Sequence, residues 1–102
     1  MTVETFRNLI AGEWVPSASG RLFDDLNPAD TREVVGRFQA SNAADARAAV
    51  DAAQAAFAGW RRTPIGKRAK VLQDAAAWIE ARADALAAEM TREEGKPLAL
   101  AK

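Results

Sequence analysis

The sequence predicts an α/β fold, in which a short β-hairpin and a further strand precede two or three long amphipathic helices. The first observation behind this prediction is that residues 1–40 are rich in aromatic and β-branched residues separated by turn-forming clusters. The second is that residues 41–102 are rich in alanine and repeat apolar residues every three or four positions. With 49% hydrophobic and 27% charged residues, the composition is that of an ordinary globular protein.

Short extended segments are expected in the first part of the chain. They are residues 6–10, 13–15, 21–26 and 33–38. The turn Ala11-Gly12 separates the first two, and the breaker cluster at 16–20 precedes the third, which is expected to return alongside them. Within the last segment, Gly36 indicates a bulge or the close approach of another part of the chain.

The second part of the chain opens with a helix start signal. Ser41 or Asn42 can cap the helix, and Asp45 lies in the first turn, where a carboxylate meets the positive end of the helix dipole. The apolar residues that follow fall on one face. They are Ala46, Val50, Ala53, Phe57 and Trp60.

A second helical stretch is expected from Pro64, with Thr63 as its cap and Gly95 followed by Pro97 as its end. A break near residues 82–84 is also expected, with Asp84 as a fresh cap. The apolar stripe of this stretch consists of Ala69, Leu72, Ala76, Ile79, Ala83, Leu86 and Met90. Its three-four spacing fits either a coiled coil or, as we favour, a helix packed on its own domain, since additional apolar residues broaden the face.

Residues 98–102 have the pattern of another helix, without a cap or a polar terminus. Because so short a helix is not stable alone in water, we expect the chain to be the amino-terminal piece of a longer enzyme.

Composition excludes several functions. Fourteen basic residues balance fourteen acidic ones without a basic cluster, so nucleic acid is not an expected partner. The absence of Cys and His removes thiol nucleophiles, disulfides and the commonest zinc ligands. No secretory signal and no apolar run of membrane-spanning length is present, so we expect a cytoplasmic protein without a membrane contact.

Few residues suggest chemistry. Asp24 and Asp25 are neighbours on a strand and therefore point to opposite faces, which prevents them from acting as a catalytic pair. Glu93 and Glu94 lie in the last turn of a helix, next to its negative end, where Arg92 and Lys96 can offset them. The alternative is that a carboxylate and free carbonyls there form an oxygen-rich pocket for a cation.

The order of short motifs along the chain resembles the opening of the aldehyde dehydrogenase superfamily. The matching segments are Ile10-Ala11-Gly12-Glu13-Trp14-Val15, Ser19-Gly20, Leu26-Asn27-Pro28-Ala29, residues 34–38, residues 48–57, Trp60-Arg61, residues 68–72, Ile79-Glu80 and Glu93-Glu94-Gly95-Lys96-Pro97-Leu98-Ala99. Each motif alone is weak, and their joint order over nearly the whole chain carries the resemblance.

The resemblance implies an enzyme that oxidises an aldehyde to a carboxylic acid with NAD or NADP, and that assembles as a homo-oligomer. It implies that residues 1–102 are the amino-terminal part of a Rossmann-like cofactor-binding domain, without the catalytic domain. The family's catalytic and cofactor-binding residues lie further along its chain, so none is assigned here and the piece alone is expected to be inactive. The run at residues 27–36 resembles members that act on semialdehydes such as 2-oxoglutarate semialdehyde.

One site carries over by resemblance. Some family members hold a structural monovalent cation at positions that correspond here to Asp25, Leu26 and Glu93. Glu93 replaces the shorter Asp that is common in relatives. The competing function is an independent helical interaction module, which the apolar stripe would favour.

Overall fold

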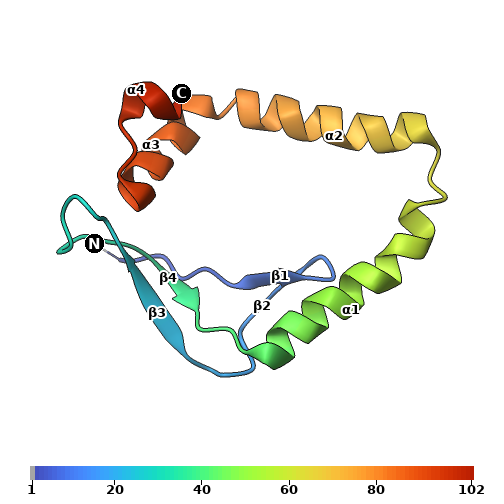
Figure 1. Ribbon diagram of the computed structural model, residues 1–102, viewed down its shortest axis with the longest axis horizontal. Helices are drawn as coiled ribbons and strands as arrows, with labels where there is room; N and C mark the ends of the chain where they lie inside the picture. Colours follow the sequence, from blue (N-terminus) through green and yellow to red (C-terminus); the bar gives the residue numbers. More distant parts are fainter. Residues whose placement is uncertain (1) are drawn as a thin grey trace.

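The computed structural model describes residues 2–102, which fold into short strands followed by helices (Figure 1). The strands are β1 (Asn8–Ile10), β2 (Glu13–Val15), β3 (Leu22–Leu26) and β4 (Val34–Gln39). The helices are α1 (Ala43–Trp60), α2 (Ile65–Glu80), α3 (Ala83–Glu94) and α4 (Leu98–Ala101). The predicted α/β class is confirmed.

The strands form two separate antiparallel hairpins, β1 with β2 and β3 with β4. The expectation that residues 21–26 return alongside residues 13–15 was therefore wrong. The reason lies in the intervening loop, where the Ser17 hydroxyl donates to the Asp45 carboxylate at 2.6 Å. This hydrogen bond fixes the loop at residues 16–20 against the start of α1. The strand β3 therefore begins away from β2 and does not pair with it.

Gly36 in β4 serves both purposes that the sequence indicated. The ladder has an irregularity at this point, because Asp25 pairs with Gly36 and Leu26 with Val34. A Cβ at Gly36 would lie 2.7 Å from the ring of Phe6, whose strand segment runs along the other edge of β4. Only glycine lets this segment approach so closely.

The start of α1 matches its prediction. Asn42 is the cap: its side chain accepts hydrogen bonds from the backbone N–H groups of Ala44 and Asp45. The Asp45 carboxylate in turn accepts from the Asn42 N–H at 2.8 Å, which completes a capping box. Two of the N–H groups that a helix leaves unpaired at its start are thereby satisfied.

Two other predicted caps were wrong. The Thr63 hydroxyl does not cap α2 but donates to the Gly59 carbonyl at 3.0 Å, within the turn that ends α1. Asp84 is already inside α3, where it forms an ion pair with Lys102 at 3.0 Å. The break itself is present, since α2 ends at Glu80 and α3 begins at Ala83. It divides the apolar stripe between two helices, so the continuous coiled coil is not formed.

The molecule is an open ring rather than a compact body. In Figure 1, α2 runs along the top of the ring and α1 along its lower right, while the hairpins and α3 close the ring on the left. The radius of gyration is 17.0 Å, against about 13 Å for a compact domain of this length. Among residues 2–102, Ala87 is the only buried hydrophobic residue, at 2% exposure. No helix within this range is both long and apolar enough to cross a membrane.

Candidate functional site

Two of the motif-bearing segments meet in space: the turn after β3 and the carboxyl end of α3. Glu33 joins them, because its carboxylate accepts from the Asn27 amide at 2.7 Å and from Arg92 Nε at 2.9 Å. These hydrogen bonds, the one from Asn27 first, hold the pKa of the Glu33 carboxyl below its usual value. Arg92 is thus engaged with Glu33, on a segment far away in sequence.

Gly95 completes this junction. It ends α3 with a left-handed φ of 81°, as the sequence predicted. A Cβ on Gly95 would lie 3.1 Å from Cγ of Pro28, so the helix end packs directly on the turn. The segment Asn27-Pro28-Ala29 and the segment Gly95-Lys96-Pro97 therefore contact each other.

The junction brings two of the three predicted cation-site residues together. Asp25 on β3 and Glu93 on α3 line the same two pockets, one of about 490 Å³ and one of about 440 Å³. Leu26, the third predicted residue, lines neither pocket. Within residues 2–102, no three Asp, Glu, His or Cys side chains are grouped to hold a metal ion. The cation site therefore stays a prediction.

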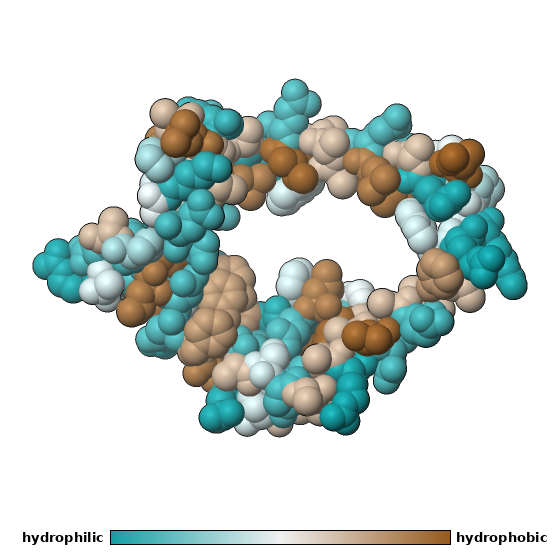
Figure 2. Space-filling view, viewed as in Figure 1, coloured by the Kyte–Doolittle hydropathy of each residue, from teal (hydrophilic) through white to brown (hydrophobic). Residues whose placement is uncertain are grey.

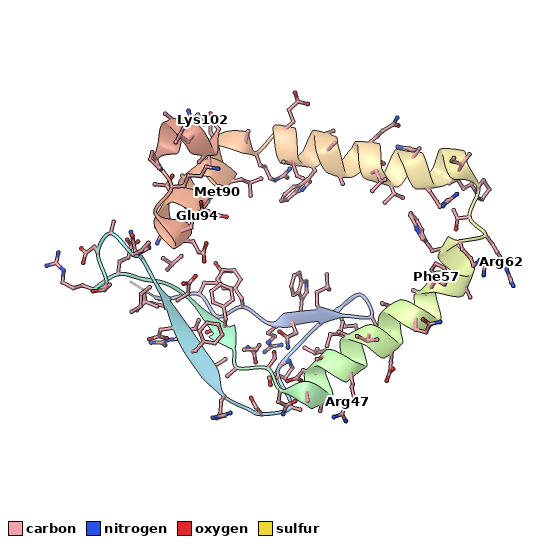
Figure 3. The ribbon with its side chains drawn as sticks, viewed as in Figure 1. Arg47, Phe57, Arg62, Met90, Glu94 and Lys102 are labelled. Atoms are coloured by element: carbon pink, nitrogen blue, oxygen red, sulfur yellow. The ribbon has the colours of Figure 1, made fainter. Side chains whose placement is uncertain are left out.

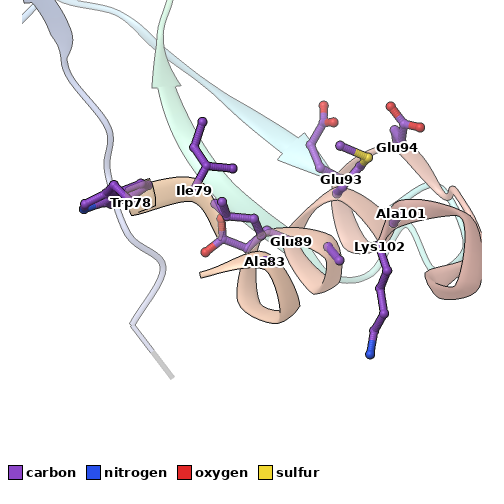
Figure 4. A pocket seen from close by; sticks show the side chains of 11 residues that line it. Trp78, Ile79, Ala83, Glu89, Glu93, Glu94, Ala101 and Lys102 are labelled. Atoms are coloured by element: carbon purple, nitrogen blue, oxygen red, sulfur yellow. The ribbon is translucent and has the colours of Figure 1, made fainter. Parts of the chain in front are cut away.

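A larger cleft of about 740 Å³ lies where α2, α3 and α4 meet (Figure 4). Its walls are mainly apolar and include Trp78 and Ile79 of α2. Its charged groups are three carboxylates and a single amine, from Glu89, Glu93, Glu94 and Lys102. Figure 4 shows Glu93 and Glu94 on one side of α3 and Lys102 projecting to the other. Carboxylates therefore outnumber amines in the lining of this cleft.

The second polar centre joins the loop at 16–20 to α1. Asp45 accepts from the Ser17 hydroxyl and, at 2.8 Å, from the Ala18 N–H. Donation from Ser17, and next from the N–H groups of Ala18 and Asn42, lowers the pKa of the Asp45 carboxyl. So weak a base does not activate a serine, and the sequence contains no His to do so. The cluster is structural.

Sequence reasoning missed both side-chain networks. The Ser17–Asp45 contact joins residues 28 apart in the sequence, and the Arg92–Glu33 contact joins residues 59 apart. No local sequence pattern therefore predicts either contact. Only the hydrogen bond between Asn27 and Glu33 had a sequence signal, because these two residues flank a short turn that contains a proline.

The comparisons with known proteins agree on one family. The profile described as "Aldehyde dehydrogenase family" matches residues 14–102. The chain is 46% identical over 90 residues to the alpha-ketoglutarate semialdehyde dehydrogenase of Haloferax volcanii, covering 88% of this chain and 19% of that protein. It is 43% identical over 98 residues to the alpha-ketoglutaric semialdehyde dehydrogenase of Bacillus subtilis, covering 96% of this chain and 20% of that protein.

Solved structures agree as well. The fold superimposes on an NAD-dependent aldehyde dehydrogenase from Sinorhizobium meliloti with a TM-score of 0.91 and 35% identity, over 98% of this chain and 20% of that chain. The chain thus spans about a fifth of the length of the relatives that it matches. The comparisons give no support to an independent helical interaction module. The chain belongs to the aldehyde dehydrogenase family.

Proposed function

We propose that this chain is the outer part of the cofactor-binding domain of an enzyme that oxidises an aldehyde, or a semialdehyde, to a carboxylic acid with NAD or NADP. The observation that carries the proposal is the match of 98% of the chain to one fifth of an NAD-dependent aldehyde dehydrogenase. The names of the Haloferax and Bacillus relatives support a semialdehyde as the substrate class.

The chain's own role is that of a scaffold. It has neither the Cys that could attack an aldehyde nor a His. We therefore propose that residues 1–102 alone are inactive, and that nucleophile and cofactor contacts come from the rest of an aldehyde dehydrogenase chain. A cytoplasmic location and assembly into a homo-oligomer are proposed on the family resemblance and on the balanced charge.

A structural cation site is also proposed at the junction of β3 and α3. Asp25 and Glu93 border the same pockets, and the last carbonyls of α3 add negative potential there. Oxygen donors of this kind suit a hard monovalent cation, with the Leu26 backbone oxygen as a further ligand. The longer side chain of Glu93 reaches further from the helix than an Asp would.

A chimera tests the main proposal. Residues 1–102 replace the matching fifth of the Bacillus subtilis relative, and the reduction of NAD or NADP is measured with that enzyme's semialdehyde. Since a misplacement of about 1 Å can cost roughly 100-fold in rate, a correct scaffold predicts kcat/KM within about tenfold of the parent. The control is the parent without its own segment, for which we expect no activity. A soluble chimera as inactive as that control would contradict the proposal.

A further inference from the structure

One face of the strands meets α3 across two adjoining pockets. Phe23 and Asp25 are two positions apart on β3 and therefore point to the same side of the hairpin. They pair with Phe38 and Gly36 of β4, which lie on that side as well. The segment before β1 runs along the other edge of β4 and adds Phe6 to the same side. Side chains from three stretches of backbone therefore form one surface opposite α3.

Three phenylalanine rings cover the middle of this surface. The ring of Phe38 stacks on Phe6 with centroids 4.9 Å apart and on Phe23 with centroids 5.9 Å apart. Phe6 is 39% exposed and Phe23 is 53% exposed, so contacts within residues 2–102 leave these rings accessible. Figure 3 shows aromatic side chains on the β3–β4 hairpin, below the end of α3 that carries Glu94. These three rings are called the aromatic row below.

Carboxylates surround the aromatic row. The acidic residues that line the pocket of about 490 Å³ are Glu4, Asp25, Glu89 and Glu93. The pocket of about 440 Å³ adjoins it, because Phe38, Asp25 and Glu93 line both. In Figure 2, tan apolar side chains on the strands lie beside the teal hydrophilic side chains of α3. The two pockets together are called the acidic groove below.

The negative charge of the acidic groove is not balanced by the residues that line it. Arg92 is the basic residue in its lining, but the Arg92 guanidinium donates to Glu33 outside the groove, at 2.9 Å from Nε. Within residues 2–102, none of the four acidic residues forms an ion pair. The groove therefore combines accessible aromatic rings with uncompensated carboxylates on both of its walls.

An organic ammonium ion matches both features. A cation that lies over the face of an aromatic ring is attracted by the negative charge of the π electrons. The N–H groups of an ammonium ion donate strong hydrogen bonds to carboxylates. Its methylene groups cover apolar ring surface, which a hydrated inorganic ion does not do. Charge complementarity along an extended groove favours a chain with several ammonium groups.

We propose that the acidic groove binds a linear polyamine, a chain of methylene groups that carries two or more ammonium groups. One ammonium group lies between Asp25 and Glu93, and the methylene chain crosses the aromatic row. This ammonium group takes the place of the monovalent cation proposed above for the same two carboxylates. The inference goes beyond the proposed function, since polyamine binding requires neither an aldehyde nor a dinucleotide.

The experiment is a calorimetric titration of the chimera described above with spermidine, at low salt so that counterions do not screen the groove. We expect one saturable site with a dissociation constant below about 1 mM. Propylamine has a single ammonium group and should bind at least about tenfold more weakly, because it makes fewer charge-assisted hydrogen bonds. A soluble chimera that gives no saturable heat with spermidine would overturn the proposal.

Three variants locate the site. Glu93→Gln removes one charge, and we expect it to raise the dissociation constant of spermidine at least about tenfold. Glu94→Gln is the matched control, because the adjacent Glu94 lines neither pocket, and it should leave the constant unchanged. Phe23→Leu keeps an apolar side chain at a half-exposed position and removes the ring, which should raise the constant about two- to fivefold.

The outcomes separate the possible occupants. Weakening by Glu93→Gln with no effect of Phe23→Leu would identify a site for inorganic cations and overturn the polyamine proposal. Equal weakening by Glu93→Gln and Glu94→Gln would show general attraction to an acidic helix, which also overturns it. A folded chimera that binds spermidine but forms no NADH or NADPH counts against the proposed function alone. An active chimera without spermidine binding counts against the polyamine site alone.

Discussion

Asp45 connects the loop at residues 16–20 to the start of α1 through a single carboxylate. It accepts from the N–H of Asn42, the cap of α1, and from the Ser17 hydroxyl and the Ala18 N–H of the loop at residues 16–20. Since buried charged groups are tolerated only when hydrogen-bonded, the 8% exposure of Asp45 makes each of these donors important. The sequence predicted a cap at Ser41 or Asn42 and an acid, Asp45, in the first turn, but it predicted neither the reciprocal hydrogen bond of the capping box nor the loop contact.

We expect Asp45→Asn to loosen both the loop and the helix start. The pKa of Asp45 in the folded state lies below its ordinary value of 3.8. The carboxylate therefore stabilises the fold above that pH, and this contribution is lost as the pH falls through the lowered pKa. Hydrogen exchange of the Ala18 amide in the chimera at neutral pH should become roughly tenfold faster, as befits loss of a charge-assisted bond.

The control for this change is Asp51→Asn, because Asp51 is exposed on the same helix. It should leave the exchange of Ala18 unchanged. The difference between Asp45→Asn and the parent should shrink as the pH falls below the ordinary pKa of Asp45. An Asp45→Asn protein with parental exchange rates would show that the carboxylate does not hold the loop.

The cation proposal also depends on a single side chain. Glu93→Gln in the chimera keeps the shape of Glu93 and removes its charge, so we expect it to abolish stabilisation by sodium or potassium ions. The measurement is the melting temperature of the chimera in each chloride salt against an organic cation. Glu94→Gln, the adjacent acid, serves as the control and should keep the salt response. An unchanged response of Glu93→Gln would rule the site out.

At the scale of helices and strands, the sequence predicted helix ends correctly where glycine or proline restricts the backbone conformation. Gly95 ends α3 in the left-handed conformation that glycine adopts without strain, and Pro97 precedes α4. Polar side chains predicted helix starts less reliably. The Thr63 hydroxyl, expected to cap α2, donates instead to the Gly59 carbonyl of α1. Strand pairing was decided by distant contacts such as Ser17 with Asp45, which a reading of neighbouring residues does not contain.

Two glycine substitutions should have opposite effects. Gly95→Ala places a side chain in the left-handed region and 3.1 Å from Pro28, and should destabilise by roughly 1–2 kcal/mol. Gly59→Ala lies in α1 with nothing within 4 Å of the added methyl, and should stabilise by roughly 0.5–1 kcal/mol. Urea unfolding of the chimera is expected to shift its midpoint down for the first and up for the second. Shifts in the same direction would contradict this account of the α3 end.

At the scale of the whole molecule, the ring shape explains why the sequence pattern was ambiguous. A broad apolar face on α2 predicts burial, yet α2 has no buried residue within this chain. Contacts within residues 2–102 therefore do not account for the apolar face of α2. The order of the short motifs told more about the protein than the apolar pattern of α2 did, because it predicted the family to which the chain belongs.

The free 102-residue chain should behave as a protein without a closed core. We expect it to bind the dye ANS and to melt over a broad temperature range, as exposed apolar surface and loose packing dictate. Fluorescence of the dye and circular dichroism measure both properties. A sharp, cooperative melt without dye binding would show that the ring is stable by itself.

The central claim is that this chain is the scaffold of an aldehyde dehydrogenase cofactor-binding domain, and the activity of the chimera tests it most directly. The measurement is the rate at which the chimera forms NADH or NADPH from the semialdehyde of the Bacillus relative. The account predicts a rate within about tenfold of the parent enzyme, because a correctly shaped scaffold leaves the catalytic geometry undisturbed. A soluble, folded chimera that forms neither product would contradict it.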